Sequence, residues 1–204
     1  MPEAPMKRRT GSPGRPGYDL DSLLSVAVRV FNERGYDATS MGTLATSLGL
    51  TKSSIYHHVA SKEELLDLAL TRALSGLFSV TTEAGATSGR YIDRLEHVVR
   101  RSVHVLVAEL PYVTLLLRVR GNSEVERRAL ARRREFDGFV AGLVTAAVGE
   151  GDLSADVDPA LTSRLVFGMV NSLIEWYRPR PGHSADELAD AVVAVAFDGL
   201  RRPR

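Results

Sequence analysis

The sequence predicts an all-helical protein of about nine helices, in which an N-terminal three-helix unit precedes a larger helical domain. Along most of the chain, apolar residues recur at spacings of three and four, which is typical of amphipathic helices. Glycine, proline and small capping residues interrupt these apolar stripes at intervals that suit helix ends. No segment alternates between apolar and polar residues as a half-buried strand does, so a sheet is not expected.

The composition is that of an ordinary globular chain. It has 204 residues, of which 44% are hydrophobic and 25% charged, enough to bury a substantial core. No apolar run is long enough to span a bilayer, and the basic N-terminus lacks the apolar segment of a signal peptide. Cysteine is absent, which excludes disulfides and a thiol nucleophile. We therefore expect a cytoplasmic protein without a bound cofactor.

Residues 1–18 form a basic segment rich in proline and glycine. It has four basic side chains, from Lys7 to Arg15, and one acidic side chain, Glu3, whereas the net charge of the whole chain is only +1. This composition predicts a disordered arm. The arm either enters the minor groove of DNA, as homeodomain arms do, or is a plain solvated tail. The sequence leaves both interpretations open.

The first helix is expected from Leu20 to Arg34 because its apolar residues form one stripe. Asp19 or Asp21 can cap its N-terminus, and Gly35 can end it. The stripe would pack on the following segment and complete a three-helix domain over residues 19–66. Its members are Leu20, Leu23, Leu24, Ala27, Val30 and Phe31.

The stretch after this helix has the pattern of a helix-turn-helix. Gly49 lies where the chain must turn sharply, because glycine adopts a left-handed backbone angle without steric cost. Ser40 precedes one short helix and Thr51 the next, and a hydroxyl at such a position accepts a hydrogen bond from a free backbone amide. Ser61 and Glu64 have the spacing of a capping box that begins a third helix.

The second short helix, expected over residues 52–58, displays polar side chains that can bond to phosphates and base edges, and it has no acidic residue. We interpret it as a recognition helix for the major groove. The alternative is a small solvated helix packed on a helical domain. Lysine at a helix start is badly placed for the helix dipole, so a phosphate contact explains it better. The expected DNA contacts are Thr39, Lys52, Ser53, Ser54, Tyr56, His57, His58 and Lys62.

These residues resemble the DNA-binding domain of the TetR family of bacterial repressors. The resemblance covers about residues 20–70 and departs from the family at Leu48, where alanine is usual, and at Val59, where phenylalanine is usual. Both positions stay apolar, so only packing detail is affected. The resemblance implies a repressor that binds double-stranded operator DNA as a homodimer and responds to a small molecule. The matching residues are Thr39, Leu44, Ala45, Gly49, Leu50 and Thr51, then Ile55 to His58, then Ser61 to Leu66.

The remainder, residues 67–204, is expected to be a ligand-binding and dimerisation domain. A helix leads into it from Ser61, and the small residues at 81–89 predict a loop. Pro111 interrupts the next helix, whereas Asp158 followed by Pro159 is typical of a helix start. The expected helices are 61–80, 91–110, 112–119, 123–148, 159–177 and 184–200.

The last two of these helices are apolar on nearly all sides, which is more apolar surface than one small domain can cover. In proteins of the TetR family, the last two helices usually form a four-helix interface with a second copy, so a homodimer is implied. A competing interpretation places Asn171 and Trp176 on a ligand cavity. One helix can serve both purposes with different faces.

Aromatic residues of this domain are numerous enough to line an apolar cavity, although each of them can equally fill the core. The segment from Asn171 to Tyr177 resembles a TetR subgroup that senses acyl-CoA thioesters, which implies an acyl-CoA effector. Arginines between 118 and 134 either hold its phosphates or form a charged outer face, with Glu124 and Arg128 paired along the helix. The expected ligand contacts are Tyr112, Arg118, Phe136, Phe139, Phe167, Asn171 and Trp176.

A helical enzyme, or a ligand-binding protein acting on an apolar small molecule, is the alternative function. Against an enzyme, the chain lacks a cysteine, a phosphate-binding loop and a nucleophile-elbow serine. His97 and His104 lie seven residues apart, whereas metal-binding pairs on helices more often lie three or four apart, so no metal site is expected. We therefore expect a regulator and not an enzyme.

Overall fold

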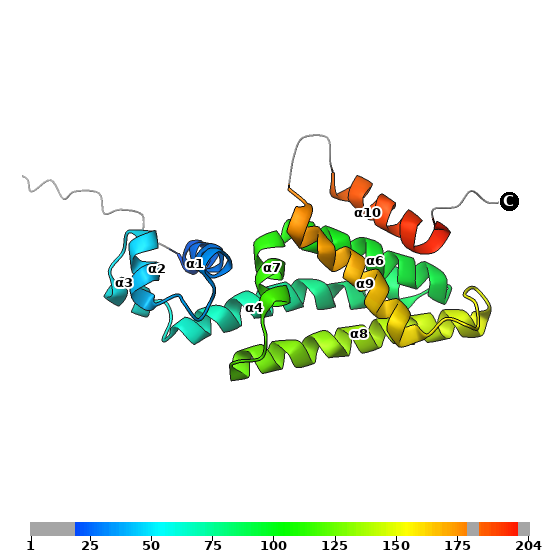
Figure 1. The fold of residues 1–204 in the computed structure, drawn as a ribbon, viewed down its shortest axis with the longest axis horizontal. Helices are drawn as coiled ribbons and strands as arrows, with labels where there is room; N and C mark the ends of the chain where they lie inside the picture. Colours follow the sequence, from blue (N-terminus) through cyan, green and yellow to red (C-terminus); the bar gives the residue numbers. More distant parts are fainter. Residues whose placement is uncertain (1–18, 179–183, 200–204) are drawn as a thin grey trace, which may run out of the picture.

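The computed structural model describes residues 19–178 and 184–199. Within these ranges every regular element is helical, as predicted (Figure 1). The basic arm over residues 1–18 and the predicted helix end at Leu200 lie outside the described residues. None of the described helices is both long and apolar enough to cross a membrane. The elements are α1 (Leu20–Arg34), α2 (Met41–Leu48), α3 (Lys52–Tyr56), α4 (Lys62–Ser79), η1 (Val80–Thr82), α5 (Ala84–Thr87), α6 (Tyr91–Ala108), α7 (Leu110–Arg118), α8 (Glu124–Glu150), α9 (Pro159–Trp176), α10 (Ala185–Val193) and η2 (Ala194–Asp198).

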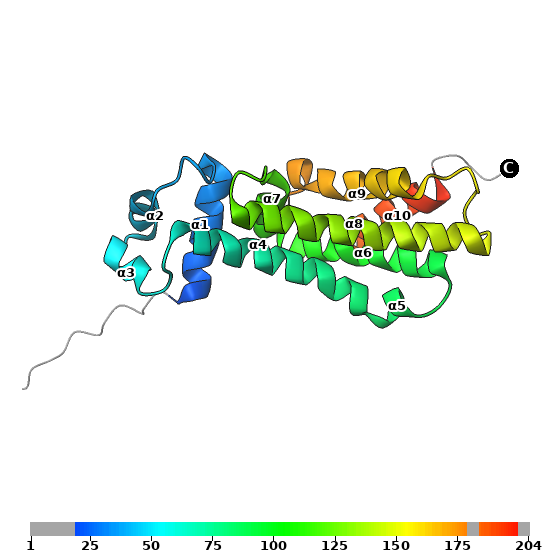
Figure 2. The ribbon, with the colours of Figure 1, turned by 90° about the horizontal axis from the view of Figure 1, so that it is seen from below.

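The helices form an elongated molecule with two parts (Figures 1 and 2). At one end α1, α2 and α3 form a small unit, and at the other end α6 to α10 form a bundle. Helix α4 begins in the small unit and continues along the bundle (Figure 2). The proposed domain boundary between residues 66 and 67 therefore falls inside one continuous helix.

Local capping determines the ends of the short N-terminal helices, as predicted. The Ser40 hydroxyl accepts a hydrogen bond from the Thr43 amide at 3.1 Å, and the Thr51 hydroxyl accepts one from the Ser54 amide at 3.1 Å. Gly49 has a φ angle of 64°, in the left-handed region that favours glycine. Each of these signals acts within four residues, so it depends little on the rest of the fold.

The predicted capping box at the start of α4 is only half formed. The Ser61 hydroxyl accepts from the Glu64 amide at 3.1 Å, as expected. The Glu64 carboxylate, however, accepts from the Ala60 amide at 2.5 Å and not from the amide of Ser61. Glu64 thereby fixes the residue before the cap, which sets the angle at which the chain leaves the helix-turn-helix.

The predicted loop at 81–89 is instead partly helical, with η1 and the short α5. Glu83 between them is held from outside the segment: its carboxylate bonds to Nε2 of His97 at 2.7 Å and accepts from Nε of Arg101 at 2.9 Å. Gly85 lies so close to the His97 ring that an added Cβ would be 2.4 Å from Nδ1. These contacts come from α6, so sequence spacing within 81–89 did not reveal them.

Helix α7 starts two residues earlier than predicted, because Pro111 occupies its first turn, where no amide donor is needed. Gly121 and Asn122 lie in the break between α7 and α8, as the gap between the expected helices 112–119 and 123–148 implies. The buried Glu126 carboxylate closes this break by accepting from the amides of Gly121 at 2.8 Å and Asn122 at 2.6 Å. A carboxylate that accepts two backbone bonds is stabilised despite its burial.

Candidate DNA-binding surface and ligand cavity

Helix α3 is anchored by one apolar residue and exposes its polar ones. Ile55 is fully buried against the helices of the small unit. Lys52, Ser53 and His57 are exposed, and the Tyr56 side chain is 51% exposed although it is large and aromatic. Residues 38–62 have no acidic residue, so no carboxylate of this segment opposes an approaching phosphate backbone. His58, just beyond the helix, is exposed as well.

Two of the expected DNA contacts have other roles in the structure. Thr39 is only 2% exposed, and its hydroxyl donates to the Gly35 carbonyl at 2.8 Å, so its side chain closes the loop before α2. The Ser54 hydroxyl is 2.9 Å from that of Thr51 and belongs to the cap of α3. Both residues position the recognition helix, and the expectation that the Thr39 side chain meets DNA is corrected.

The two lysines of the motif differ in their surroundings. Lys52 is exposed and its aliphatic part lies over Gly42, where an added Cβ would come within 3.0 Å of Lys52 Cε. Lys62 is half-buried: its ammonium donates to the Tyr36 carbonyl at 2.9 Å and lies 4.1 Å from the centre of the Tyr36 ring. Lys62 therefore holds the end of α1 to the start of α4, which the sequence did not indicate.

This difference predicts separate effects for Lys52→Met and Lys62→Met. Lys52→Met should lower the slope of log affinity against log salt by about 0.9 per subunit, because one phosphate contact is lost. Lys62→Met should leave that slope unchanged and lower the free energy of unfolding by about 1–2 kcal/mol, from a charge-assisted hydrogen bond and a cation–π contact. Fluorescence anisotropy over a salt series and thermal unfolding measure the two effects. A reduced slope for Lys62→Met would show that Lys62 contacts a DNA phosphate after all.

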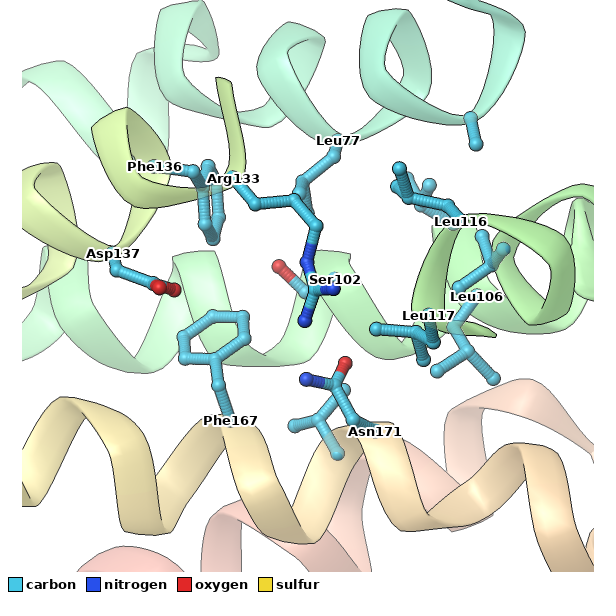
Figure 3. Close-up of a pocket in the computed structure, with 14 residues that line it drawn as sticks. Leu77, Ser102, Leu106, Leu116, Leu117, Arg133, Phe136, Asp137, Phe167 and Asn171 are labelled. Atoms are coloured by element: carbon cyan, nitrogen blue, oxygen red, sulfur yellow. The ribbon is translucent and has the colours of Figure 1, made fainter. Parts of the chain in front are cut away.

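A cavity lies in the middle of the bundle, enclosed by α4, α6, α7, α8 and α9 (Figure 3). Its volume is about 50 Å³. Phe136 on α8 and Phe167 on α9 line it and meet edge-to-face, with ring centres 5.3 Å apart. Leucine and valine side chains form most of the remaining wall, so the cavity is mainly apolar. Such a space with a few polar groups is typical of a small-molecule site.

Four polar side chains line this cavity: Ser102 from α6, Arg133 and Asp137 from α8, and Asn171 from α9 (Figure 3). Ser102 is only 3% exposed, and its hydroxyl has no hydrogen-bond partner in the described part of the chain. Burial lowers the pKa of Arg133, and Asp137 one turn further along α8 partly opposes this effect. Arginine nevertheless stays protonated, so the cavity contains a positive charge.

Of the expected ligand contacts, Phe136, Phe167 and Asn171 line the cavity and the others do not. Tyr112 is buried, but its hydroxyl accepts from Arg72 at 3.3 Å beneath that guanidinium. Phe139 packs behind Phe136 with ring centres 6.3 Å apart. Trp176 is 59% exposed at the end of α9. These three side chains therefore lie outside the lining of this cavity, and their role as ligand contacts stays a prediction.

Arg118 also lies outside the lining of the cavity, and its role as a ligand contact stays a prediction. It is exposed and donates to the Asn32 carbonyl at 3.1 Å, so it joins α7 to α1. The Asn32 amide in turn donates to the Pro111 carbonyl at 2.8 Å. Helix α7 thus contacts the DNA-binding unit through α1 and the cavity through Leu116 and Leu117. It therefore touches both the DNA-binding unit and the wall of the cavity.

The arginine cluster on α8 is mostly paired with carboxylates. Glu124 pairs with Arg127 at 2.8 Å and not with Arg128, which instead reaches Asp67 on α4 at 3.1 Å. Arg132 pairs with Glu135 and also lies 4.0 Å from the centre of the Phe78 ring. Arg128 and Arg132 line a surface groove between α4 and α8 of about 520 Å³. The charged outer face is thus the better description of most of the cluster.

Ser102 was missed as a residue of the cavity, and Arg133 was expected only as one of the arginines between 118 and 134, although a signal for both existed. Ser102 interrupts the buried stripe of α6 formed by Val98, Val99 and Leu106 at helical spacing. Arg133 lies in register with the stripe of α8, four residues after Ala129 and three before Phe136. A polar residue at a position where the stripe is otherwise apolar is unfavourable for packing, so it indicates a role other than packing.

One face of α9 is apolar and uncovered. Leu161 is 56% exposed and Leu165 65% exposed, and Trp176 lies on the same face about three turns beyond Leu165. Gly168 falls between them, and an added Cβ there would meet nothing within 4 Å, so another helix can approach closely. Monomeric proteins rarely leave such a contiguous apolar face in water.

Comparison with known proteins follows the same division into two parts. Residues 23–69 match the family described as "Bacterial regulatory proteins, tetR family", and residues 88–200 match "Tetracyclin repressor-like, C-terminal domain". The chain is 28% identical to the HTH-type transcriptional repressor KstR2 of Rhodococcus jostii, over 100% of this chain and 99% of the relative. The matched regions include α3, the first part of α4 and all the other helices that enclose the cavity.

Solved structures show the same fold. A member of the TetR transcriptional regulator family from Streptomyces coelicolor A3 is 56% identical, with a TM-score of 0.86 over 95% of this chain and 96% of that one. The regulator AibR, crystallised with isovaleryl coenzyme A and operator DNA, has a TM-score of 0.74 and 24% identity, over 87% of this chain and 97% of that one. The second likeness concerns the fold alone.

Proposed function

The chain belongs to the TetR family of bacterial transcriptional regulators, and from this premise we propose that it is a homodimeric repressor released from its operator by an acyl-CoA thioester. The proposal rests above all on α3, a capped helix that exposes Lys52, Ser53, Tyr56 and His57 and has no acidic residue. A helix of this kind fits the major groove, where side chains read base edges. We place the protein in the cytoplasm, where operator DNA is accessible.

The homodimer is supported by the uncovered face of α9. Two copies related by a two-fold axis bury the same patch on each other, and Leu161 and Leu165 provide its apolar centre. Each subunit then presents one recognition helix, so the operator should be a near-palindrome. In the simplest arrangement its half-sites lie about 34 Å apart, one turn of DNA.

The effector site is proposed to be the central cavity, with Phe136, Phe167 and Asn171 as ligand contacts. The acyl group would enter the cavity, and the phosphates would lie in the groove between α4 and α8, where Arg128 and Arg132 could exchange their carboxylate partners for them. Phe78 separates the two spaces: it lines the groove and packs edge-to-face on Phe136, with ring centres 5.9 Å apart. AibR, crystallised with isovaleryl coenzyme A, shows that this fold can hold an acyl-CoA thioester.

The signal is proposed to travel through α7. A ligand larger than about 50 Å³ must displace part of the wall, and α7 provides Val113, Leu116 and Leu117 to that wall. Movement of α7 shifts α1 through the bonds of Asn32 to Pro111 and Arg118. Bound ligand then favours a conformer in which the two recognition helices no longer match the half-sites.

Calorimetry with a panel of acyl-CoA thioesters, with and without operator DNA, tests this mechanism. By linkage, the operator must weaken thioester binding by the same factor by which the thioester weakens operator binding, a factor of about 5–150 in coupled systems. A thioester that binds equally well in both cases contradicts the mechanism. In Asn32→Ala, which removes the bond to Pro111, the coupling factor should fall while the affinity for each ligand alone is retained.

A further inference from the structure

The polar groups inside the cavity are unusual because one of them is a cation without a counter-ion. Figure 3 shows the Arg133 guanidinium extending from α8 towards Ser102 and Asn171, into the space between α6 and α9. Nowhere in residues 19–178 and 184–199 does a carboxylate form an ion pair with Arg133. Its neighbours Arg127, Arg128 and Arg132 are all paired.

A role in packing alone explains this arrangement poorly. Desolvating an unpaired cation is unfavourable, and an apolar residue at this register position would fill the core without that cost. Asp137 lines the same cavity and its charge partly offsets the desolvation of Arg133, but among the described residues it forms no ion pair with the guanidinium. Ser102, buried and without a partner, adds a second unused donor that is aimed at the same space.

We propose that the cavity binds a carboxylate group of the effector, held by Arg133 with Ser102 and Asn171 as further hydrogen-bond donors. A planar guanidinium matches a carboxylate with two parallel hydrogen bonds, and a serine hydroxyl and an amide can each donate one more. The effector class is therefore an acyl thioester whose acyl chain ends in a carboxylate. This inference rests on the proposed function, because it assumes that the effector enters the central cavity.

The size of the cavity agrees with this assignment. One water needs about 10–15 Å³ of such space, so about 50 Å³ holds a carboxylate without rearrangement. The carbon chain that follows it needs further space, which the apolar residues of α7 and the pair Phe78–Phe136 can provide by moving. The charged end of the ligand thus meets a preformed site, whereas the apolar part opens the wall.

A matched pair of ligands tests the inference on the unmodified protein. Octanoyl-CoA and octanedioyl-CoA have the same chain length and differ in a terminal carboxylate. Isothermal titration calorimetry should give at least about tenfold tighter binding of octanedioyl-CoA, because its carboxylate pairs with a desolvated guanidinium. If the cavity offered no partner for the carboxylate, octanoyl-CoA would bind more tightly than octanedioyl-CoA, since burying an unpaired carboxylate is unfavourable.

Substitutions identify the residues that cause the preference for octanedioyl-CoA. Arg133→Met keeps the length of the side chain and removes the charge, so it should bind octanoyl-CoA at least as well as octanedioyl-CoA. Arg134→Met removes the same charge from an exposed position of α8 and should retain the tenfold preference. Ser102→Ala should reduce the preference by a few fold. Because Arg133→Met also removes a half-buried charge that has no ion-pair partner among the described residues, its unfolding temperature without ligand should rise.

The outcomes separate this inference from the proposed function. If octanoyl-CoA binds as tightly as octanedioyl-CoA and releases the operator, the carboxylate site is overturned and the thioester-responsive repressor stands. If neither thioester binds although a gel shift shows operator binding, both the carboxylate site and the thioester effector are overturned. A preference that survives in Arg133→Met equally overturns the assignment of the site.

Discussion

Replacing Leu165 with Asp should convert the homodimer into monomers at micromolar concentration. Leu165 is 65% exposed in one subunit and lies at the centre of the apolar face of α9. In the dimer the substitution removes the burial of a leucine, about 2–5 kcal/mol by analogy with core truncations, in each of two symmetric copies. It also buries an unpaired carboxylate in each copy. Since 1.4 kcal/mol is a factor of ten, the dissociation constant should rise by about a thousandfold or more.

Sedimentation velocity over a concentration series measures this change directly. Ser75→Asp is the matched control, because it adds the same charge to an exposed position of α4, on the other side of the bundle from α9 (Figure 2). The control should remain dimeric with unchanged operator affinity. A Leu165→Asp protein that sediments as the unmodified protein does would mean that the subunits meet through another surface.

Replacing Tyr56 with Ala should weaken operator binding by about a hundredfold or more at constant salt. The Tyr56 ring projects from α3 into water and offers both a hydroxyl and an apolar surface to the DNA. A side chain that contacts bases contributes about 1–3 kcal/mol, and a dimer loses this contact in both half-sites. Ile55 stays buried in the variant, so the helix itself should persist.

Gel shifts with a fixed operator fragment measure the Tyr56→Ala effect. Tyr91→Ala is the control, because Tyr91 begins α6 at the end of the bundle far from α3, and its backbone bond to Glu150 does not depend on the ring. Tyr91→Ala should leave operator affinity unchanged even if it lowers the unfolding temperature. Intact operator affinity in Tyr56→Ala would show that α3 is wrongly placed on the DNA.

The helix-turn-helix could be predicted from the sequence because its signals are local. Ser40 and Thr51 each cap the helix that follows by accepting a hydrogen bond from the amide three residues further on. Gly49 takes the left-handed backbone angle that the turn requires. The spacing of apolar residues likewise predicted the ends of most longer helices to within two residues. Interactions of this range are already decided by the order of the residues, whatever the rest of the chain does.

The C-terminal site could be predicted only in part, because the sequence does not say which face of a helix its neighbour covers. Phe136, Phe167 and Asn171 were expected at the cavity, and the structure places them there. Trp176 is likewise aromatic, but it is exposed at the end of α9. Arg118 can bind an anion, but it bonds to the Asn32 carbonyl on α1. A shift of one or two residues along a helix turns a side chain by 100–200° at 3.6 residues per turn, so composition alone does not separate these cases.

By itself, the sequence determined that this protein is an all-helical regulator with a capped recognition helix, since caps, turns and apolar periodicity act over a few residues. Only the tertiary structure decided the partners across helices. It pairs Lys62 with Tyr36 and Arg128 with Asp67, and it leaves Arg133 unpaired in the cavity. The physical reason is that ion pairing and desolvation depend on distances between atoms of different helices, which are set by how the helices pack and not by their spacing in the chain.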